Sequence, residues 1–136
     1  MSHTAGLDLG STYTKVVILD DDGRIAARLM KPTGFKFAEV ATTAYAEALE
    51  QGGLKAEDVD YVVNTGFGRH QARLGDAQVT DLTAGARGAA FLFPGTRTIL
   101  DVGGQTMKAT RLGDAAKVRS FRLNDKCAAG TGAFLE

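Results

Sequence analysis

The stretch that decides the fold is an eight-residue string that occurs twice. The first copy is Asp8-Leu9-Gly10-Ser11-Thr12-Tyr13-Thr14-Lys15, and the second copy, 93 residues further along, is Asp101-Val102-Gly103-Gly104-Gln105-Thr106-Met107-Lys108. Both read D-x-G-x-x-x-x-K, and both follow a short apolar run typical of a buried strand. One such string is weak evidence, but two in matching context indicate a duplicated structural unit.

The residues around each copy predict a hairpin. After the first copy, residues 14–20 and 24–30 form two extended runs on either side of the turn signal Asp21-Asp22-Gly23. After the second copy, residues 106–112 and 117–123 lie on either side of Gly113-Asp114. The same strand, turn and strand therefore follow both copies at one offset.

The remaining pattern completes an α/β chain. Apolar residues at helical spacing predict a helix over residues 37–49, which Gly52-Gly53 ends, and residues 81–93 predict a second helix. Buried strands are predicted at 5–9, 59–63 and 98–102, and residues 64–69 form a glycine-rich loop. We expect a mixed sheet with helices on both faces. Residues 1–95 are predicted to form one half of a duplicated fold, and residues 96–136 the incomplete start of the second half.

The repeated string suits phosphate chemistry. Glycines at a sharp turn leave backbone N–H groups open, and consecutive N–H groups form an anion-binding nest. An aspartate at the strand end can hold a hydrated divalent ion, and a lysine on the next strand can neutralise phosphate charge. Two such hairpins facing each other would clamp a polyphosphate. The alternative is two ordinary hairpins whose aspartates and glycines serve only the turns.

Composition excludes several classes of protein. Of 136 residues, 44% are apolar and 24% are charged, and the 16 basic and 16 acidic residues balance, which argues against a nucleic-acid binder. No apolar run approaches the length of a membrane span, and no secretory signal is visible. Cys127 is the only cysteine, so an intrachain disulfide is impossible, and we expect a cytoplasmic protein.

Four strings resemble one family of the actin, sugar-kinase and heat-shock-chaperone ATPase superfamily. They are Thr65-Gly66-Phe67-Gly68-Arg69, Gly85-Ala86-Arg87-Gly88-Ala89, Asp101-Val102-Gly103-Gly104-Gln105 and, above all, residues 124–136, which begin N-D-K-C-A-A-G-T-G. The family is that of the BadF/BadG/BcrA/BcrD ATPases, which includes activators of 2-hydroxyacyl-CoA dehydratases and ATPase subunits of benzoyl-CoA reductase. The resemblance spans residues 5–136.

The resemblance implies an ATPase with Mg²⁺ that drives low-potential electron transfer. Its site residues would be Asp8 and Asp101 for magnesium, Gln105 for the attacking water, and a phosphate-binding set of Gly10, Ser11, Thr12, Lys15, Gly103, Gly104 and Lys108. Cys127 would ligate a 4Fe-4S cluster shared across a homodimer or a heterodimer with a related subunit. The implied partners are a ferredoxin or flavodoxin donor and a dehydratase or reductase acceptor, with no nucleic acid and no membrane.

Two features leave alternatives open. The family's second phosphate motif usually reads G-G-Q-D-[ST]-K, and here Thr106 and Met107 replace its acid and hydroxyl residue. This departure favours a non-catalytic nucleotide-binding partner subunit as one alternative, and a small-molecule kinase of the same superfamily is another.

Arg69 is either a phosphate or dimer contact or a surface charge. We also expect the chain to be a fragment of a protein of roughly 250–300 residues.

Overall fold

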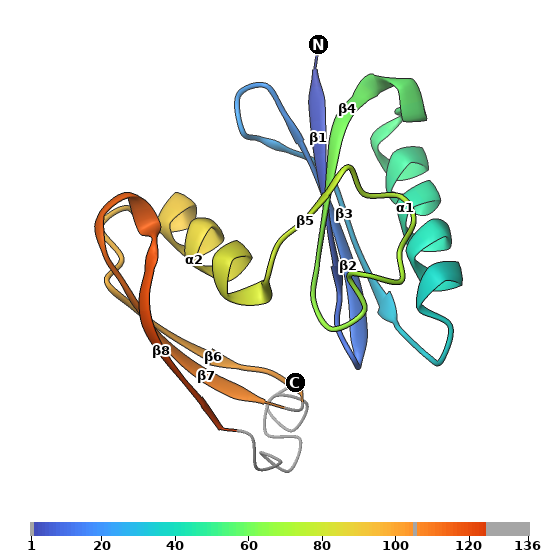
Figure 1. Cartoon of the computed structure of the whole chain (residues 1–136). Coiled ribbons are helices and arrows are strands. Elements are labelled where there is room, and N and C mark those ends of the chain that lie inside the picture. The colour runs from blue at the N-terminus through green and yellow to red at the C-terminus, as the bar shows by residue number, and fades with distance from the viewer. Residues whose placement is uncertain (1, 105, 125–136) are drawn as a thin grey trace. The chain divides into compact units, whose positions relative to one another are not determined.

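The computed structural model describes residues 2–104 and 106–124, which form two compact units (Figure 1). The first unit contains residues 1–79 and the second contains residues 80–136. The sequence pattern places the boundary near residue 95. In the structure the helix α2 (Asp81–Leu92) instead packs on strands of the second unit, so the division falls between Val79 and Thr80.

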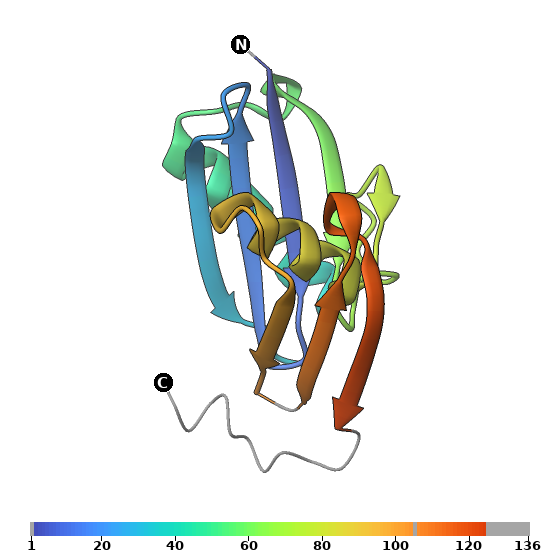
Figure 2. The same ribbon diagram turned by 90° about the vertical axis from the view of Figure 1, so that its left-hand side faces the viewer.

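The first unit is built on a five-stranded mixed sheet in the order β3-β2-β1-β4-β5 (Figure 2). Its strands are β1 (His3–Leu9), β2 (Tyr13–Asp20), β3 (Ile25–Pro32), β4 (Val59–Thr65) and β5 (Ala77–Gln78). The first three strands form an antiparallel meander, whereas β4 runs parallel to β1 and β5 runs parallel to β4. The two-residue strand β5 carries too short a pattern to be predicted from the sequence.

The helix α1 (Phe37–Gly52) supplies the core of the first unit by packing on β1, β2 and β3. Its predicted end is confirmed, because Gly53 takes the left-handed conformation with φ 66° that favours glycine. A short 3₁₀ turn (Ala56–Asp58) then leads into β4. The core consists of apolar side chains from one face of the sheet, from the helix and from the segment between β4 and β5, namely Ala5, Leu7, Leu9, Val16, Ile18, Ala27, Ala41, Ala44, Tyr45, Ala48, Val62 and Ala72.

The second unit is a three-stranded antiparallel sheet with one helix. The order is β6-β7-β8, with β6 (Thr98–Val102), β7 (Met107–Leu112) and β8 (Val118–Asn124). A 3₁₀ turn (Asp114–Ala116) joins the last two strands. The Thr80 hydroxyl caps α2 by accepting a hydrogen bond of 3.3 Å from the Thr83 N–H.

The two meanders have the same strand register, which confirms the duplication. Asp8 lies opposite Lys15 in the first, and Asp101 lies opposite Lys108 in the second. The outer strand pairs match as well, including a register shift after Ile18 in β2 and after Arg111 in β7. Since these two shifts are also 93 residues apart, the offset holds over the whole three-stranded unit and not only over the repeated string.

Candidate functional site

The first hairpin turns tightly at Gly10. The Gly10 N–H donates a hydrogen bond of 3.1 Å to the Tyr13 carbonyl, which closes the turn between β1 and β2. A Cβ atom at Gly10 would lie 2.7 Å from that carbonyl oxygen, so no other residue fits there without displacing backbone. The Gly10 N–H is thus engaged in the turn, contrary to the expectation that it stands open. Ser11 and Thr12 are the exposed residues at the tip.

Thr33, which follows β3, ties this turn to the sheet. Its hydroxyl donates to the Gly10 carbonyl at 2.8 Å, and its N–H donates to the Thr12 carbonyl at 3.0 Å. The Thr33 hydroxyl also lies 2.9 Å from the Thr14 hydroxyl, and both residues are buried. The turn is therefore held in one shape before any ligand binds. No sequence pattern singles out Thr33, because its role depends on the pairing of β3 with β2.

Asp8 and Lys15 form an ion pair across the mouth of the hairpin. The Lys15 Nζ lies 3.3 Å from the Asp8 Oδ2, and the two side chains are 45% and 40% exposed. The lysine reaches back over the turn, since its Nζ would be 3.5 Å from a Cβ atom at Gly10. A carboxylate and an ammonium group accordingly stand next to the tip residues, as the sequence predicted.

A loop of residues 65–69, here called the Gly66 loop, packs against the same strand end. Gly66 has φ +90°, and a Cβ atom on it would lie 2.5 Å from the Asp8 Oδ1 and 2.7 Å from the Leu9 carbonyl oxygen. The Gly68 N–H donates to the Leu9 carbonyl at 2.9 Å, and the Arg69 Nη1 donates to the Gly66 carbonyl at 3.1 Å. The loop therefore braces Asp8 from the side of β4, and Arg69 serves the shape of this loop.

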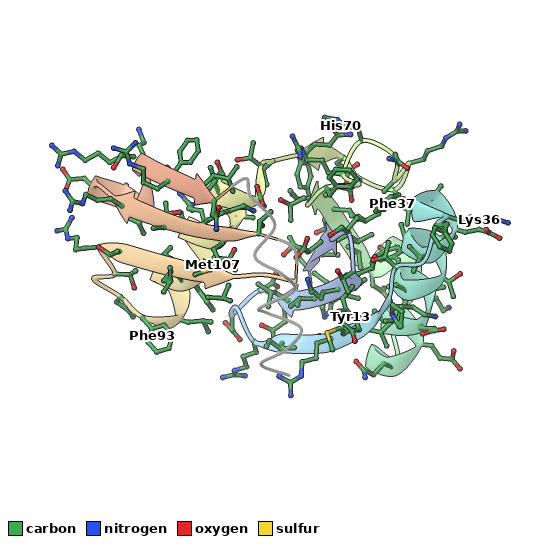
Figure 3. The ribbon with its side chains drawn as sticks, turned by 90° about the horizontal axis from the view of Figure 1, so that it is seen from below. Tyr13, Lys36, Phe37, His70, Phe93 and Met107 are labelled. Atoms are coloured by element: carbon green, nitrogen blue, oxygen red, sulfur yellow. The ribbon has the colours of Figure 1, made fainter. Side chains whose placement is uncertain are left out.

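The Gly66 loop is also fixed from the side of α1. Phe37, labelled in Figure 3, is the first residue of α1 and packs against Gly68. Its ring centroid lies 5.9 Å from that of Phe67. Thr65 lies beside Asp8 in the parallel register, and its Oγ1 is buried without a hydrogen-bond partner among the described residues. A buried hydroxyl beside a carboxylate at the carboxyl ends of two parallel strands is typical of a ligand-facing position.

The second hairpin repeats this turn with different side-chain contacts. The Gly103 N–H donates to the Thr106 carbonyl at 2.8 Å, the counterpart of the bond at Gly10. Lys108, however, forms an ion pair with Asp81 in the first turn of α2 rather than with Asp101, and its side chain is only 17% exposed. Asp101 is exposed, and no ion pair holds it within the described ranges.

The predicted site residues thus fall into two groups. Asp8, Gly10, Ser11, Thr12 and Lys15 come together in the first unit, and Asp101, Gly103, Gly104 and Lys108 come together in the second. Gln105 and Cys127 lie outside the described residues. Thr33, Thr65 and Asp81 were missed. Asp81 precedes an apolar run and reads from the sequence only as a first-turn helix residue.

Within residues 2–104 and 106–124, no helix is long and apolar enough to cross a membrane. The same residues contain no cluster of three or more histidine, cysteine or acidic side chains that could by itself hold a metal ion. A divalent ion at either hairpin would therefore need oxygen ligands from a nucleotide and water in addition to the aspartate.

Comparison with known proteins shows which family the chain resembles. Residues 5–136 match the BadF/BadG/BcrA/BcrD ATPase family. The activator of lactoyl-CoA dehydratase from Anaerotignum propionicum is 44% identical over 134 residues, which cover 98% of this chain and 51% of the activator. The chain spans about half the length of the curated relatives it matches.

Two solved structures share the arrangement. Component A of (R)-2-hydroxyglutaryl-CoA dehydratase from Acidaminococcus fermentans matches with a TM-score of 0.88 at 36% identity, over 99% of this chain and 52% of that chain. The activator of 2-hydroxyisocaproyl-CoA dehydratase from Clostridium difficile, solved with bound ADPNP, matches with a TM-score of 0.86 at 40% identity, over 98% and 49%. Sugar kinases match at much lower identity and share the fold alone.

Proposed function

The chain belongs to the BadF/BadG/BcrA/BcrD ATPase family, and we propose that it carries the phosphate-binding hairpins of an ATPase that drives low-potential electron transfer to a CoA-thioester dehydratase or reductase. The observation that carries the proposal is the duplicated hairpin, with its aspartate, its tight glycine turn and its lysine in the same register in both units. The activator from Clostridium difficile was solved with bound ADPNP, which supports a nucleotide as the ligand in this proposal.

The first hairpin fits a magnesium nucleotide. Gly66 lets its loop approach the Asp8 carboxylate more closely than a Cβ atom would allow, Gly10 does the same for the turn at the Tyr13 carbonyl, and the buried Thr65 hydroxyl beside Asp8 has no hydrogen-bond partner among the described residues. In this proposal the N–H groups of Ser11 and Thr12 bind phosphate oxygens, and Asp8 holds Mg²⁺ through water. When bound, the ion neutralises the charge that develops on the phosphates.

Lys15 has two states in this scheme. Without nucleotide it pairs with Asp8 at 3.3 Å, which satisfies both charges at the open hairpin. Phosphate oxygens would compete for the ammonium group, and Mg²⁺ would compete for the carboxylate. Breaking the pair costs little, because an exposed ion pair contributes at most about 1 kcal/mol. The second hairpin would act in the same way through Asp101, Gly103 and Gly104, with Gln105 orienting the attacking water.

Cys127 is proposed as the ligand of a 4Fe-4S cluster shared across a homodimer or heterodimer. It lies outside the described residues, so the proposal rests on the family resemblance of residues 124–136 and on the general preference of such clusters for thiolates. The cluster would supply one-electron transfer. A ferredoxin or flavodoxin donor, a dehydratase or reductase acceptor and a cytoplasmic location belong to the same proposal.

Hydrolysis is tested with the full-length protein that contains this chain. Asp101→Ala should lower the rate of phosphate release at saturating Mg-ATP by at least about 100-fold, the loss typical of removing a group that stabilises transition-state charge. Asp114→Ala, which removes an exposed carboxylate from the turn after β7, is the matched control and should leave the rate unchanged. Equal rates for Asp101→Ala and the parent would overturn the role of the second hairpin.

The cluster is tested by anaerobic reconstitution with iron and sulfide. The parent protein should develop the visible absorption of a 4Fe-4S cluster, and Cys127→Ser should abolish it while leaving nucleotide binding intact. If the parent takes up no cluster, or if the serine variant keeps the signal, the electron-transfer part of the proposal fails and the ATPase part stands.

A non-catalytic nucleotide-binding subunit is the second candidate. It is favoured by Thr106, which stands where the family usually has an acid, and by the engagement of Lys108 with Asp81. On this reading the full-length protein binds Mg-ATP but releases no phosphate, with or without its partner. Phosphate release that depends on Asp101 would exclude it.

A further inference from the structure

Thr65, the last residue of β4, carries a hydroxyl that has no partner in the empty site. Its Oγ1 is buried and makes no hydrogen bond to any described residue. A buried donor without an acceptor costs stability, so the group calls for an explanation other than packing. Because the oxygen is already covered, a group from elsewhere in the protein can reach it only by displacing what covers it. Its acceptor must therefore be an immediate neighbour.

Two other buried polar atoms share this property but lie away from the hairpin. The His3 Nδ1 stands at the first residue of β1, whereas Asp8 lies near the end of that strand. The Asn64 Oδ1 belongs to an amide whose Nδ2 donates to the Ala72 carbonyl at 3.2 Å, so that side chain holds the segment between β4 and β5. Of these three atoms, the Thr65 hydroxyl is the one beside a charged group of the phosphate hairpin.

That charged group is the Asp8 carboxylate. Asp8 and Thr65 are partners in the parallel pairing of β1 with β4, so their side chains project from the same sheet face. The Asp8 Oδ1 is turned toward the side of β4, since a Cβ atom on Gly66 would lie 2.5 Å from it. The Oδ2 is turned toward β2, where the Lys15 Nζ lies 3.3 Å away. The two carboxylate oxygens thus face the threonine side and the lysine side of the strand.

The buried threonines of the hairpin itself behave differently. The Thr14 and Thr33 hydroxyls lie 2.9 Å apart, and the Thr33 hydroxyl donates to the Gly10 carbonyl at 2.8 Å. Both hydroxyls are therefore satisfied in the empty site, where they hold the shape of the turn. The Thr65 hydroxyl makes no such contribution, so its role belongs to another state of the site.

We propose that Thr65 is a positioning residue for Asp8, whose carboxylate accepts a hydrogen bond from the Thr65 hydroxyl when a magnesium nucleotide is bound. The inference rests on the proposed function of the first hairpin. In the empty site Lys15 holds Oδ2, and the Thr65 hydroxyl is idle. Once phosphate oxygens attract the ammonium group, the Thr65 hydroxyl takes its place as a donor to the carboxylate through Oδ1. Oδ2 is then held facing the water shell of the metal ion.

The first test measures the stability of the full-length protein without nucleotide. Thr65→Val replaces the hydroxyl by a methyl group of similar size, and the urea midpoint should stay the same or rise, because no hydrogen bond is lost. Thr14→Val is the contrasting variant and should lower the midpoint, because it leaves the Thr33 hydroxyl without one of its partners. A drop for Thr65→Val as large as for Thr14→Val would show that the hydroxyl is already bonded in the empty protein, and would overturn the proposal.

The second test measures ADP affinity by calorimetry, once with excess Mg²⁺ and once with a chelator. In Thr65→Val the gain in affinity that Mg²⁺ provides should fall by about tenfold, the loss expected for one hydrogen bond to a charged group, while the affinity in chelator stays the same. Thr65→Ser restores the hydroxyl and should recover most of the gain. Thr43→Val, at an exposed position of α1, is the matched control and should keep the parent values.

The outcomes separate this inference from the proposed function. If the parent binds ADP equally with Mg²⁺ and with chelator, the first hairpin is not a magnesium nucleotide site, and both fail. If the parent gains affinity from Mg²⁺ and Thr65→Val gains as much, only the role of Thr65 fails. An equal loss of affinity with and without Mg²⁺ would also overturn that role, because the variant would then disturb the nucleotide site as a whole rather than the placement of Asp8.

Discussion

The two hairpins of this chain share a backbone and differ in where the lysine goes. In the first, Lys15 pairs with Asp8 across the turn, and both side chains are nearly half exposed. In the second, Lys108 pairs with Asp81 of α2 and is largely buried, so Asp101 stands without that cross-strand pair. Duplication preserved the register of the strands, while the neighbouring helix redirected one charge. The comparison shows that a shared motif fixes the position of a side chain but not its ionic partner.

A second difference concerns what each sheet packs against. The first sheet buries one face completely under α1, with Leu7, Val16 and Ile18 each fully buried. In the second unit the corresponding positions hold Leu100, Ala109 and Arg111, and Leu100 is 66% exposed. Strands with the same hydrogen-bonded register can therefore form a buried sheet face in one unit and an exposed sheet face in the described part of the other.

The largest expected effect tests this second difference. Ile18→Ala should lower the free energy of unfolding by about 2–5 kcal/mol, because it leaves a cavity under α1. Arg111→Ala, at the equivalent position of the second repeat, should change it by less than about 0.5 kcal/mol. Urea denaturation of the two variants measures both values, and similar losses in the two would mean that the open face is covered in the full-length protein.

The next effect concerns the loop that braces Asp8. Gly66→Ala should destabilise the protein by about 1–3 kcal/mol, because its φ is +90° and the new Cβ would meet the Asp8 carboxylate and the Leu9 carbonyl. It should also weaken binding of Mg-ADP more than binding of ADP in the presence of a chelator, since only the first depends on the placement of Asp8.

Gly34→Ala is the control for that variant. Gly34 also has a positive φ, of +67°, but nothing lies within 4 Å of its Cβ position, so it adds backbone strain without the contact to Asp8. If Gly34→Ala changed Mg-ADP affinity as much as Gly66→Ala, the Gly66 loop would have no special part in holding the carboxylate.

A smaller effect separates the two lysines. In a double-mutant cycle, the coupling between Asp81 and Lys108 should be about 1.5 kcal/mol, because the lysine is mostly shielded from water. The coupling between Asp8 and Lys15 should be about 0.2–1 kcal/mol, as for other exposed pairs. Thermal or urea denaturation of Asp81→Asn, Lys108→Met and their combination gives the first value. A larger coupling in the exposed pair would reverse the comparison of the two hairpins.

The smallest expected effect is a pH dependence of the free energy of unfolding, and it arises from Tyr45 in α1. Burial raises the pKa of the Tyr45 phenol above its ordinary value of 10.0, and the Asp76 carboxylate adds to the shift. The folded protein then holds this proton more tightly than the unfolded chain, so the stability from Tyr45 is complete below about pH 10 and falls as the pH rises further. Tyr45→Phe should remove that part of the alkaline loss, whereas Tyr61→Phe, at a 48% exposed position, should not.

Much of the fold is predictable from the sequence because its signals are local. The periodic apolar positions of α1, the glycines that end it and the turn residues between β2 and β3 each act within a few residues. The two-residue strand β5 was not predictable, because it exists only through its pairing with β4. The helix α2 was predicted, but its assignment to the second unit depends on packing that its own residues do not encode.

The candidate site divides in the same way. Asp8, Gly10 and Lys15 are evident from the repeat, since turn geometry and strand alternation place them together. Thr33 and Thr65 were missed, because each reaches the hairpin through a neighbouring strand rather than through a motif of its own.

The sequence by itself determined the duplication, the family and the register of both hairpins, since these depend on spacing along the chain, which a 93-residue offset preserves. Only the tertiary structure decided which charges meet, because an ion pair such as Lys108 with Asp81 depends on where a helix packs and not on the interval between residues. The same reason separates Ile18 from Arg111: alternation sets the face of each side chain, and packing decides whether that face is covered.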